Sequence, residues 1–322
     1  AVRLTQVSFP NTKQTTKVKV TTKCRLWAGM GHVYELSFGQ NSFIVKSVDP
    51  TQITDSIGDL RKAASYKVEA NFYKSFAETL LDEHNLPLPR VFYVECDGNA
   101  TIICMSKLQQ HSPRGHSGNV QEQVVKWLAR LHAATWGSSA EGLQPIGSYW
   151  YLDTRPDEHA NMSRVGWEGR LKRAARAIDS RLQRDSMQCI IHGDAKEANI
   201  LWTDQGELAM CDFQYCGKGP ATRDLAYFLC SSTNPEDEGE LLQVYYEELI
   251  RLLPDTRTKP SFETLKESLE LAFCDYARFM AGWGYWGNDI SRRVISILDQ
   301  LDGGKDLGSE EAYDEAVRRE FG

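Results

Sequence analysis

The chain has 322 residues, of which 41% are hydrophobic and 25% are charged, and its formal net charge is −7 at pH 7. This length allows two lobes with a large core, and the composition is that of a soluble globular protein. The acidic balance gives no indication of nucleic-acid binding, and no apolar run reaches the roughly 20 residues that a membrane-spanning helix needs.

The eight cysteines are scattered and show no Cys-x-x-Cys spacing. We therefore expect reduced, buried thiols in a cytoplasmic protein, without a zinc site or a disulfide framework. Because the chain begins with Ala1 rather than Met, the sequence leaves open whether a segment was removed from its N-terminus.

The first 48 residues have the pattern of β-strands. Residues 18–22 alternate and are rich in β-branched side chains. Segments 32–38 and 42–48 follow, joined by the turn-forming triplet Gly39-Gln40-Asn41, and together they predict a β-hairpin.

Two features of this region are candidates for a binding site. Gly29 and Gly31 precede the hairpin, and glycine lets backbone N–H groups approach the oxygen atoms of a nucleotide closely. An ordinary turn is the alternative. Lys46 lies inside the apolar run Phe43 to Val48, where a charge is unfavourable unless it is paired. A lysine that points into water from an edge strand is the alternative.

A long helix is predicted over residues 57–83, because apolar residues recur there at every fourth position: Leu60, Ala64, Val68, Phe72, Phe76 and Leu80. Two prolines in Leu86-Pro87-Leu88-Pro89 end this helix. A second hairpin follows, with strands at 91–95 and 101–105, and it completes a five-stranded sheet.

From Val120 the pattern is mostly helical, after a loop predicted over 109–119. His132 lies on the apolar face of the first of these helices, and we interpret it as a packed core residue. Residues 170–184 predict a basic helix, which we interpret as a solvated face; docking of an anionic substrate is the alternative. Residues 235–322 predict acidic helices.

These acidic helices contain an aromatic segment that runs from Phe279 to Trp286. Trp283, Tyr285 and Trp286 offer ring faces that attract a quaternary ammonium group by cation–π interaction. A core helix rich in large side chains is an equally weighted alternative.

The most informative stretch runs from Ile190 to Gln214. Asp194 and Asn199 lie five positions apart in a polar loop between two apolar runs, and Asp212 ends the strand that returns after a turn. Phosphoryl transfer needs such a set: one carboxylate orients the attacking hydroxyl and takes its proton, while an amide oxygen and a second carboxylate hold Mg²⁺. A polar hairpin with a satisfied buried aspartate is the alternative.

This block resembles the catalytic loop and metal-binding strand of the protein-kinase-like fold. Among its members it is similar to small-molecule kinases: aminoglycoside phosphotransferases, choline kinases and, most closely, the ecdysteroid-kinase-like group. The Gln of Asp212-Phe213-Gln214 favours that last group over protein kinases, which have Asp-Phe-Gly. Residues 223–229 resemble the Asp-Leu-Ala segment of the family. The resemblance is strong over about 120–230, moderate before and weak after.

The resemblance implies a two-lobed α+β fold. The small lobe, residues 1–105, would hold a nucleotide-binding sheet and one long helix, and the mostly helical large lobe, residues 106–322, would hold the catalytic loop, the metal site and the acceptor pocket. The implied activity is transfer of the γ-phosphate of ATP, with Mg²⁺, to a hydroxyl group of a small organic acceptor. No nucleic-acid or membrane partner is implied, and the acceptor, the choice between ATP and GTP and the oligomeric state stay open.

Two other functions compete with this one. A protein kinase is disfavoured by the short segment after Asp212 and by the absence of Asp-Phe-Gly. An inactive nucleotide-binding scaffold, or pseudokinase, is disfavoured because it has no need to retain four polar site residues: Lys46, Asp194, Asn199 and Asp212.

The resemblance also implies roles for single residues. Asp194 would position and deprotonate the hydroxyl, Asn199 and Asp212 would hold Mg²⁺, and Lys196 would neutralise charge on the transferred group. His192 would shape the loop by hydrogen bonding. Asp224 would cap the next helix and hydrogen-bond the catalytic loop.

The remaining implied roles concern the nucleotide. Lys46 would hold the α- and β-phosphates, braced by Glu69, with Glu78 as the alternative partner. Backbone groups of a hinge between the lobes would hold adenine, at Met105, Ser106 and Leu108.

Overall fold

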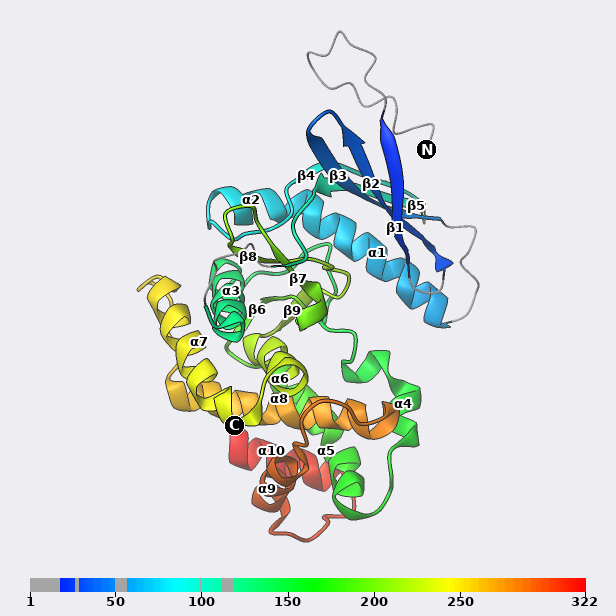
Figure 1. The fold of residues 1–322 in the computed structure, drawn as a ribbon. Helices are drawn as coiled ribbons and strands as arrows, with labels where there is room; N and C mark the ends of the chain where they lie inside the picture. The colour runs from blue at the N-terminus through cyan, green and yellow to red at the C-terminus, as the bar shows by residue number, and fades with distance from the viewer. Residues whose placement is uncertain (1–17, 27–28, 50–56, 99, 112–117) are drawn as a thin grey trace.

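The computed structural model describes residues 18–26, 29–49, 57–98, 100–111 and 118–322. An antiparallel sheet with its helices forms one lobe, and a mostly helical second lobe lies below it (Figure 1). The two-lobed α+β fold is therefore confirmed. The predictions for residues 1–17 and 112–117 lie outside the described residues, as do Trp27 and Ala28.

The sheet consists of five strands: β1 (Lys19–Arg25), β2 (Gly31–Phe38), β3 (Asn41–Val48), β4 (Val91–Asp97) and β5 (Ala100–Ser106). Their order is β1-β2-β3-β5-β4, and every neighbouring pair is antiparallel, so both predicted hairpins are confirmed. Lys46 pairs with Val33 on one side and Ile103 on the other. It therefore lies on the central strand, and the edge-strand alternative is wrong.

The helix predicted over 57–83 is divided at Phe76 into α1 (Ile57–Ser75) and α2 (Ala77–Asp82). Phe76 leaves the helical conformation, with φ −124° and ψ −34°. Backbone hydrogen bonds nevertheless continue across it, from Phe76 N to Phe72 O and from Leu80 N to Phe76 O. The break is therefore a local distortion of one continuous helical path.

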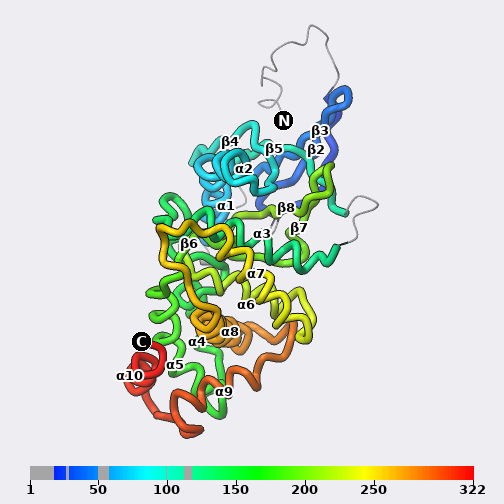
Figure 2. The backbone as a smooth tube through the Cα atoms, turned by 90° about the vertical axis from the view of Figure 1, so that its left-hand side faces the viewer, coloured from blue at the N-terminus to red at the C-terminus, as the bar shows by residue number. Residues whose placement is uncertain are grey.

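The second lobe contains eight further α-helices within the described residues: α3 (Val120–Ala134), α4 (Pro156–Asn161), α5 (Gly166–Gln183), α6 (Ala221–Ser232), α7 (Glu238–Leu252), α8 (Phe262–Trp283), α9 (Ser291–Asp302) and α10 (Glu310–Phe321). Helix α3 lies against α7, and α8 is the central helix, in contact with α4, α5, α6 and α9. Helices α9 and α10 lie at the end of this lobe farthest from the sheet (Figure 2).

The basic side chains of α5 contact the acidic C-terminal segment. Arg170 forms ion pairs with Asp299 and Asp302, each 2.6 Å long, and Arg173 pairs with Asp306. The predicted solvated face is therefore wrong for these two residues, whereas Arg176 is 62% exposed. The acidic helices and the basic helix neutralise each other, which the separate sequence patterns did not indicate.

Two short ladders frame the catalytic loop: β6 (Gln188–Ile191) pairs with β9 (Gly217–Pro220), and β7 (Ile200–Trp202) pairs with β8 (Leu208–Met210). Residues 217–220 have the glycine- and proline-rich composition of a flexible loop, but they form a strand. A side chain at Gly217 would place its Cβ 2.3 Å from the Gln144 carbonyl oxygen. Glycine is therefore needed here so that the two backbone segments can approach closely, although glycine is rare in strands.

The larger of two hydrophobic clusters in the described part of the chain extends through both lobes. At its centre Phe213 stacks on Phe72 of α1, with 3.9 Å between the ring centroids, and also contacts Trp127 of α3. Phe213 is fully buried. This packing fixes the position of the preceding residue, Asp212, relative to the sheet.

Two sequence-based expectations concern solvent and membrane. All eight cysteines are free, but Cys24 and Cys96 are exposed, so the expectation of buried thiols is wrong for these two. Across the parts of the chain that the structure describes, we find no helix with the length and apolarity needed to cross a bilayer.

Candidate active site

Asp194 lies in the loop between β6 and β7 and is almost completely buried. Its Oδ2 accepts hydrogen bonds from Lys196 Nζ at 2.9 Å and from Asn199 Nδ2 at 3.2 Å, and its Oδ1 accepts one from the Tyr227 hydroxyl at 3.1 Å. Burial raises the pKa of the Asp194 carboxyl above its usual value, and Lys196 opposes this shift. The carboxylate is therefore held in one orientation and is more basic than an exposed aspartate.

Asp224 of α6 hydrogen-bonds the backbone of this loop. Its two carboxylate oxygens accept hydrogen bonds from the backbone N–H groups of His192, at 2.6 Å, and Gly193, at 2.8 Å. This agrees with the predicted contact to the catalytic loop. The predicted capping role is wrong, because α6 begins at Ala221, and Asp224 lies further into the helix.

Two histidines support the same loop. His192 Nε2 lies 3.0 Å from the Cys211 carbonyl oxygen, which agrees with a loop-shaping role. His132 is fully buried, and its Nε2 lies 3.2 Å from Asp224 Oδ2. It is therefore a core residue that positions Asp224, as its place on the apolar face predicted.

A second polar cluster joins the two lobes. Lys46 Nζ lies 2.6 Å from Glu69 Oε2 and 3.0 Å from Asp212 Oδ1. Glu78, the alternative partner, is exposed, so Glu69 is the residue that pairs with Lys46. Burial alone would lower the pKa of Lys46, but the carboxylates of Asp212 and Glu69 raise it, so the ammonium group stays protonated.

Asp212 shows two signs of a specialised position. Burial opposes its ionisation, but the nearby ammonium groups of Lys46 and Lys62 outweigh burial and lower the pKa of Asp212 to about 2. Its backbone also has φ +68°, a left-handed conformation that is uncommon for a residue other than glycine. Such conformations persist where the surrounding structure imposes them, often at functional sites.

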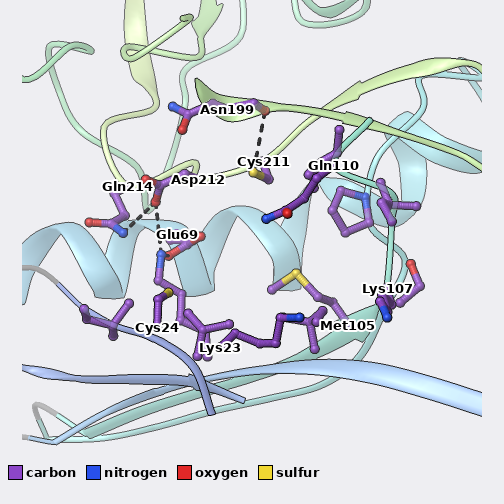
Figure 3. A pocket seen from close by; sticks show the side chains of 18 of the residues that line it. Lys23, Cys24, Glu69, Met105, Lys107, Gln110, Asn199, Cys211, Asp212 and Gln214 are labelled. Carbon is purple, nitrogen blue, oxygen red and sulfur yellow. Dashed lines mark hydrogen bonds and ion pairs between the residues drawn. The ribbon is translucent and has the colours of Figure 1, made fainter. Parts of the chain in front are cut away.

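A cavity of about 620 Å³ lies between the sheet and the catalytic loop (Figure 3). Asn199 and Asp212 line it from the large lobe, and Glu69 lines it from α1. An amide oxygen and one carboxylate suit Mg²⁺, which commonly binds one or two protein carboxylates and completes its octahedron with phosphate oxygens and water. The residues present therefore fit a nucleotide-bound Mg²⁺.

The predicted hinge also lines this cavity, at Met105, Ser106 and Leu108. Gly29, in the connection between β1 and β2, and Gly31, the first residue of β2, do not belong to its described lining. Gly31 has φ +148°, and a Cβ there would lie 2.0 Å from the Ser47 carbonyl oxygen, so the turn requires glycine for its own packing.

The three predicted aromatic residues do not share one environment. Trp283, Tyr285 and Trp286 are exposed by 60%, 58% and 39%, so the core-helix alternative is wrong for them. Trp286 contacts the ring of Tyr227, the residue that hydrogen-bonds Asp194, with 5.8 Å between centroids. Tyr285 instead donates a hydrogen bond to Glu168 at 2.6 Å.

Three residues near the predicted site were not anticipated from the sequence. Tyr227 contacts Asp194 directly, Gln214 donates a hydrogen bond to Asp212 at 2.6 Å, and Lys62 contacts Gln214 at 2.6 Å. One sequence feature could have identified Lys62 as a site residue: it lies seven positions before Glu69 and therefore on the same helical face. No sequence feature could have identified Tyr227, because its contact with Asp194 depends on how α6 packs against the loop that holds Asp194.

The fold and the site together define a protein-kinase-like small-molecule phosphotransferase. Residues 25–257 match the Phosphotransferase enzyme family, which is more than half of the chain, and the chain belongs to that family. An uncharacterized kinase-like protein of Caenorhabditis elegans is 24% identical over 231 residues, which cover 63% of this chain and 60% of that relative. The match thus spans less than two thirds of the relative's length.

Solved structures show the same fold at low identity. A microcompartment-associated aminopropanol kinase is 14% identical, covers 88% of this chain and 89% of its own, and superimposes with a TM-score of 0.52. A spectinomycin phosphotransferase in complex with ADP and spectinomycin is 12% identical, covers 94% and 89%, and has a TM-score of 0.50.

Proposed function

We propose that this chain transfers the γ-phosphoryl group of ATP to a hydroxyl group of a small uncharged or cationic organic molecule, with Mg²⁺ as cofactor. The observation that carries the proposal is the meeting of two polar clusters at one cavity. Lys46, Glu69 and Asp212 form the first, and Asn199, which lines the same cavity, contacts Asp194 of the second.

In the proposed reaction Asp194 accepts the proton of the acceptor hydroxyl as its oxygen bonds to the γ-phosphorus. The bond between that phosphorus and the β–γ bridging oxygen breaks, and ADP leaves. Lys196, 2.9 Å from Asp194, neutralises charge on the transferred group. Asn199 and Asp212 hold Mg²⁺, which when bound offsets the negative charge of the phosphates.

For nucleotide binding, Lys46 holds the α- and β-phosphates, and Glu69 keeps its ammonium group in place. Backbone groups at Met105, Ser106 and Leu108 hold adenine, and we place the boundary between the lobes at residues 105 and 106. Gly29, in the β1–β2 connection, and Gly31, at the start of β2, contribute backbone N–H groups. The likeness to a phosphotransferase solved with ADP supports ATP as the donor.

The acceptor proposal rests on the aromatic side chains around Tyr227. Tyr149 donates a hydrogen bond to the Tyr227 hydroxyl at 3.2 Å and contacts Phe279, which stacks on Trp283. Trp286 contacts Tyr227 from another side. These aromatic side chains give the region beside Asp194 an apolar wall.

Charge refines the choice of acceptor. The net charge of −7 lowers the local concentration of polyanions. The guanidinium group of Arg155, however, already lies 5.6 Å from the ring centroid of Tyr149 and 5.3 Å from that of Trp283. Because the Arg155 guanidinium group already contacts these rings, a cationic acceptor would be repelled there. An uncharged alcohol therefore fits the aromatic wall better than a quaternary ammonium compound.

A two-stage assay tests the proposal. ATP binding is first measured by calorimetry with and without Mg²⁺, and ADP release is then measured over neutral, amine-bearing and phosphorylated alcohols. We expect Mg²⁺-dependent binding and turnover of neutral alcohols first. Binding without turnover of any alcohol would favour the inactive scaffold, and preferred turnover of phosphorylated acceptors would contradict the acceptor class.

A pair of variants tests the aromatic wall. Trp286→Ala is expected to raise the KM for the acceptor while leaving the KM for ATP unchanged. Tyr285→Ala is the matched control, because its hydroxyl faces Glu168 and its ring lies near Trp167. Equal effects of the two substitutions would remove Trp286 from the wall.

A further inference from the structure

Besides Lys46 of β3, Lys62 of helix α1 also lines the cavity that we assign to the nucleotide. Lys62 lies seven residues before Glu69, and two helical turns place both side chains on one face, roughly 10 Å apart along the axis. Both residues line the cavity. Lys62 is therefore displaced from the Lys46–Glu69 pair toward the N-terminal end of α1.

That end of the helix lies near the β1–β2 connection. Tyr66, one turn after Lys62, forms a small buried cluster with Met30 and Val48, and Leu26 contacts it. The Lys62 ammonium group lies 5.2 Å from the ring centroid of Tyr66 and 5.2 Å from that of Tyr215. The side chain is thus confined between two aromatic rings, at the end of the cavity that holds Lys46 and Asp212.

Lys62 has no carboxylate partner among the residues that the structure describes. Its Nζ donates hydrogen bonds to Gln214 Oε1 at 2.6 Å and to the Tyr215 hydroxyl at 3.3 Å, both neutral acceptors. Burial lowers the pKa of Lys62, and the charge of Asp212 offsets this only in part. A partly desolvated cation with neutral partners is stabilised when an anion binds next to it.

Gln214 connects this cation to the metal-binding carboxylate. Its Nε2 donates to Asp212 Oδ1 at 2.6 Å, while its Oε1 accepts from Lys62. Gln214 is buried and lies beside Asp212 (Figure 3). One amide side chain thus sets the separation between Lys62 and Asp212.

We propose that Lys62 binds the terminal phosphate of the nucleotide, and that Gln214 and the two tyrosine rings position it. The inference rests on the proposed function, because it takes ATP as the ligand. Lys46 is paired with two carboxylates, whereas Lys62 donates hydrogen bonds to neutral partners and has no ion pair within the described residues to compete with a phosphate oxygen. The glutamine of Asp212-Phe213-Gln214 thereby acquires a physical role, which is to hold the second lysine in place.

The test compares two nucleotides that differ only in the terminal phosphate. Calorimetry with excess Mg²⁺ measures the Kd of ADP and of a non-hydrolysable ATP analogue for the wild type and for Lys62→Met. We expect the Kd of the analogue to rise at least tenfold and that of ADP to change less than threefold. Lys74→Met, an exposed lysine of the same helix, is the matched control and is expected to change neither value.

The positioning role of Gln214 gives a second readout. Gln214→Leu is expected to shift the ratio of the two Kd values in the same direction as Lys62→Met but by a smaller factor. If Lys62→Met does not fold, Lys62→Gln and Lys62→Arg replace it, and only the glutamine variant is expected to lose the preference for the analogue.

The outcomes separate this inference from the proposed function. A wild-type chain that binds neither nucleotide would overturn both. A wild-type chain that binds both nucleotides, with a ratio that no Lys62 variant changes, would overturn the role of Lys62 alone. Equal weakening of ADP and analogue would also overturn it, because Lys62 would then act on the whole nucleotide.

Discussion

At the scale of single residues, the environment of Asp194 accounts for the chemistry proposed for it. The carboxylate receives three hydrogen bonds while it is 4% exposed. These hydrogen bonds stabilise the ionised form of Asp194. Burial favours the neutral form and raises the pKa of its carboxyl group. The result is an oriented base that is stronger than an aspartate in water.

We expect Asp194→Asn to lower kcat by about 10²–10⁴-fold, because an amide cannot take the hydroxyl proton. The affinity for ATP should remain close to that of the wild type, since Asp194 does not line the described cavity. Steady-state kinetics with an identified acceptor and calorimetry with ATP measure both quantities. Retention of more than a tenth of the wild-type kcat would contradict the role of Asp194.

The pH dependence of kcat should follow the same carboxyl group. Activity requires the ionised base, so kcat should fall as the pH falls through the pKa of Asp194, which is raised above 3.8. Lys196 lowers this pKa, and Lys196→Met should therefore move the acidic limb of the profile to higher pH. Lys218→Met, which removes an exposed lysine of β9, serves as the control. An unchanged or lowered midpoint for Lys196→Met would refute the coupling.

At the scale of elements, three helices of the large lobe meet at buried charges. Arg223 of α6 lies 3.1 Å from Asp179 of α5 and 3.0 Å from Asp275 of α8. Arg278 pairs with the same Asp275 at 2.9 Å. Because α6 also carries Asp224 and Tyr227, this network fixes the helix that supports the catalytic loop.

Arg223→Met is expected to destabilise the fold by about 3–5 kcal/mol, because it leaves Asp179 without its cation and Asp275 with only one in the interior. Urea unfolding followed by circular dichroism measures the change. Arg176→Met is the matched control on α5, since Arg176 is 62% exposed, and it should change stability by less than about 0.5 kcal/mol. Similar losses for the two variants would show that the buried network is not the source.

At the scale of the whole molecule, the cavity that we assign to the nucleotide is built from both lobes. The sheet and α1 supply Lys46 and Glu69, and the large lobe supplies Asn199 and Asp212. A ligand that contacts both lobes stabilises the folded chain as a unit. By mass action, a ligand at 100 times its Kd adds about 2.7 kcal/mol to the free energy of unfolding.

Asp212→Ala should therefore remove the part of this stabilisation that depends on Mg²⁺. In the wild type we expect ATP with Mg²⁺ to raise Tm more than ATP with EDTA. In the variant the two conditions should give the same Tm, because the carboxylate ligand is lost. Asp204→Ala, an exposed aspartate in the turn between β7 and β8, should behave as the wild type. A persistent difference between Mg²⁺ and EDTA in Asp212→Ala would exclude Asp212 as a metal ligand.

The sequence by itself predicted the loop that holds Asp194 and Asn199, and it predicted the class of small-molecule phosphotransferases to which the chain belongs. Asp194 and Asn199 lie within one short loop, so their spacing along the chain already implies their proximity in space. The hairpins 31–48 and 91–106 were predictable for the same reason, because alternation and turn residues act over a few positions. The choice of Glu69 over Glu78 as the partner of Lys46 came from the resemblance to the kinase family, and the structure shows that pair.

Only the tertiary structure decided the contacts between distant segments. Lys62 and Gln214 are 152 positions apart, and Arg170 and Asp302 are 132 apart. No local pattern marks such pairs, because each depends on how whole helices approach one another. The same holds for Gly217–Pro220, which has the composition of a loop but forms a strand because β6 offers it unpaired backbone groups. Local propensity is a weak preference, and burial with satisfied hydrogen bonds outweighs it.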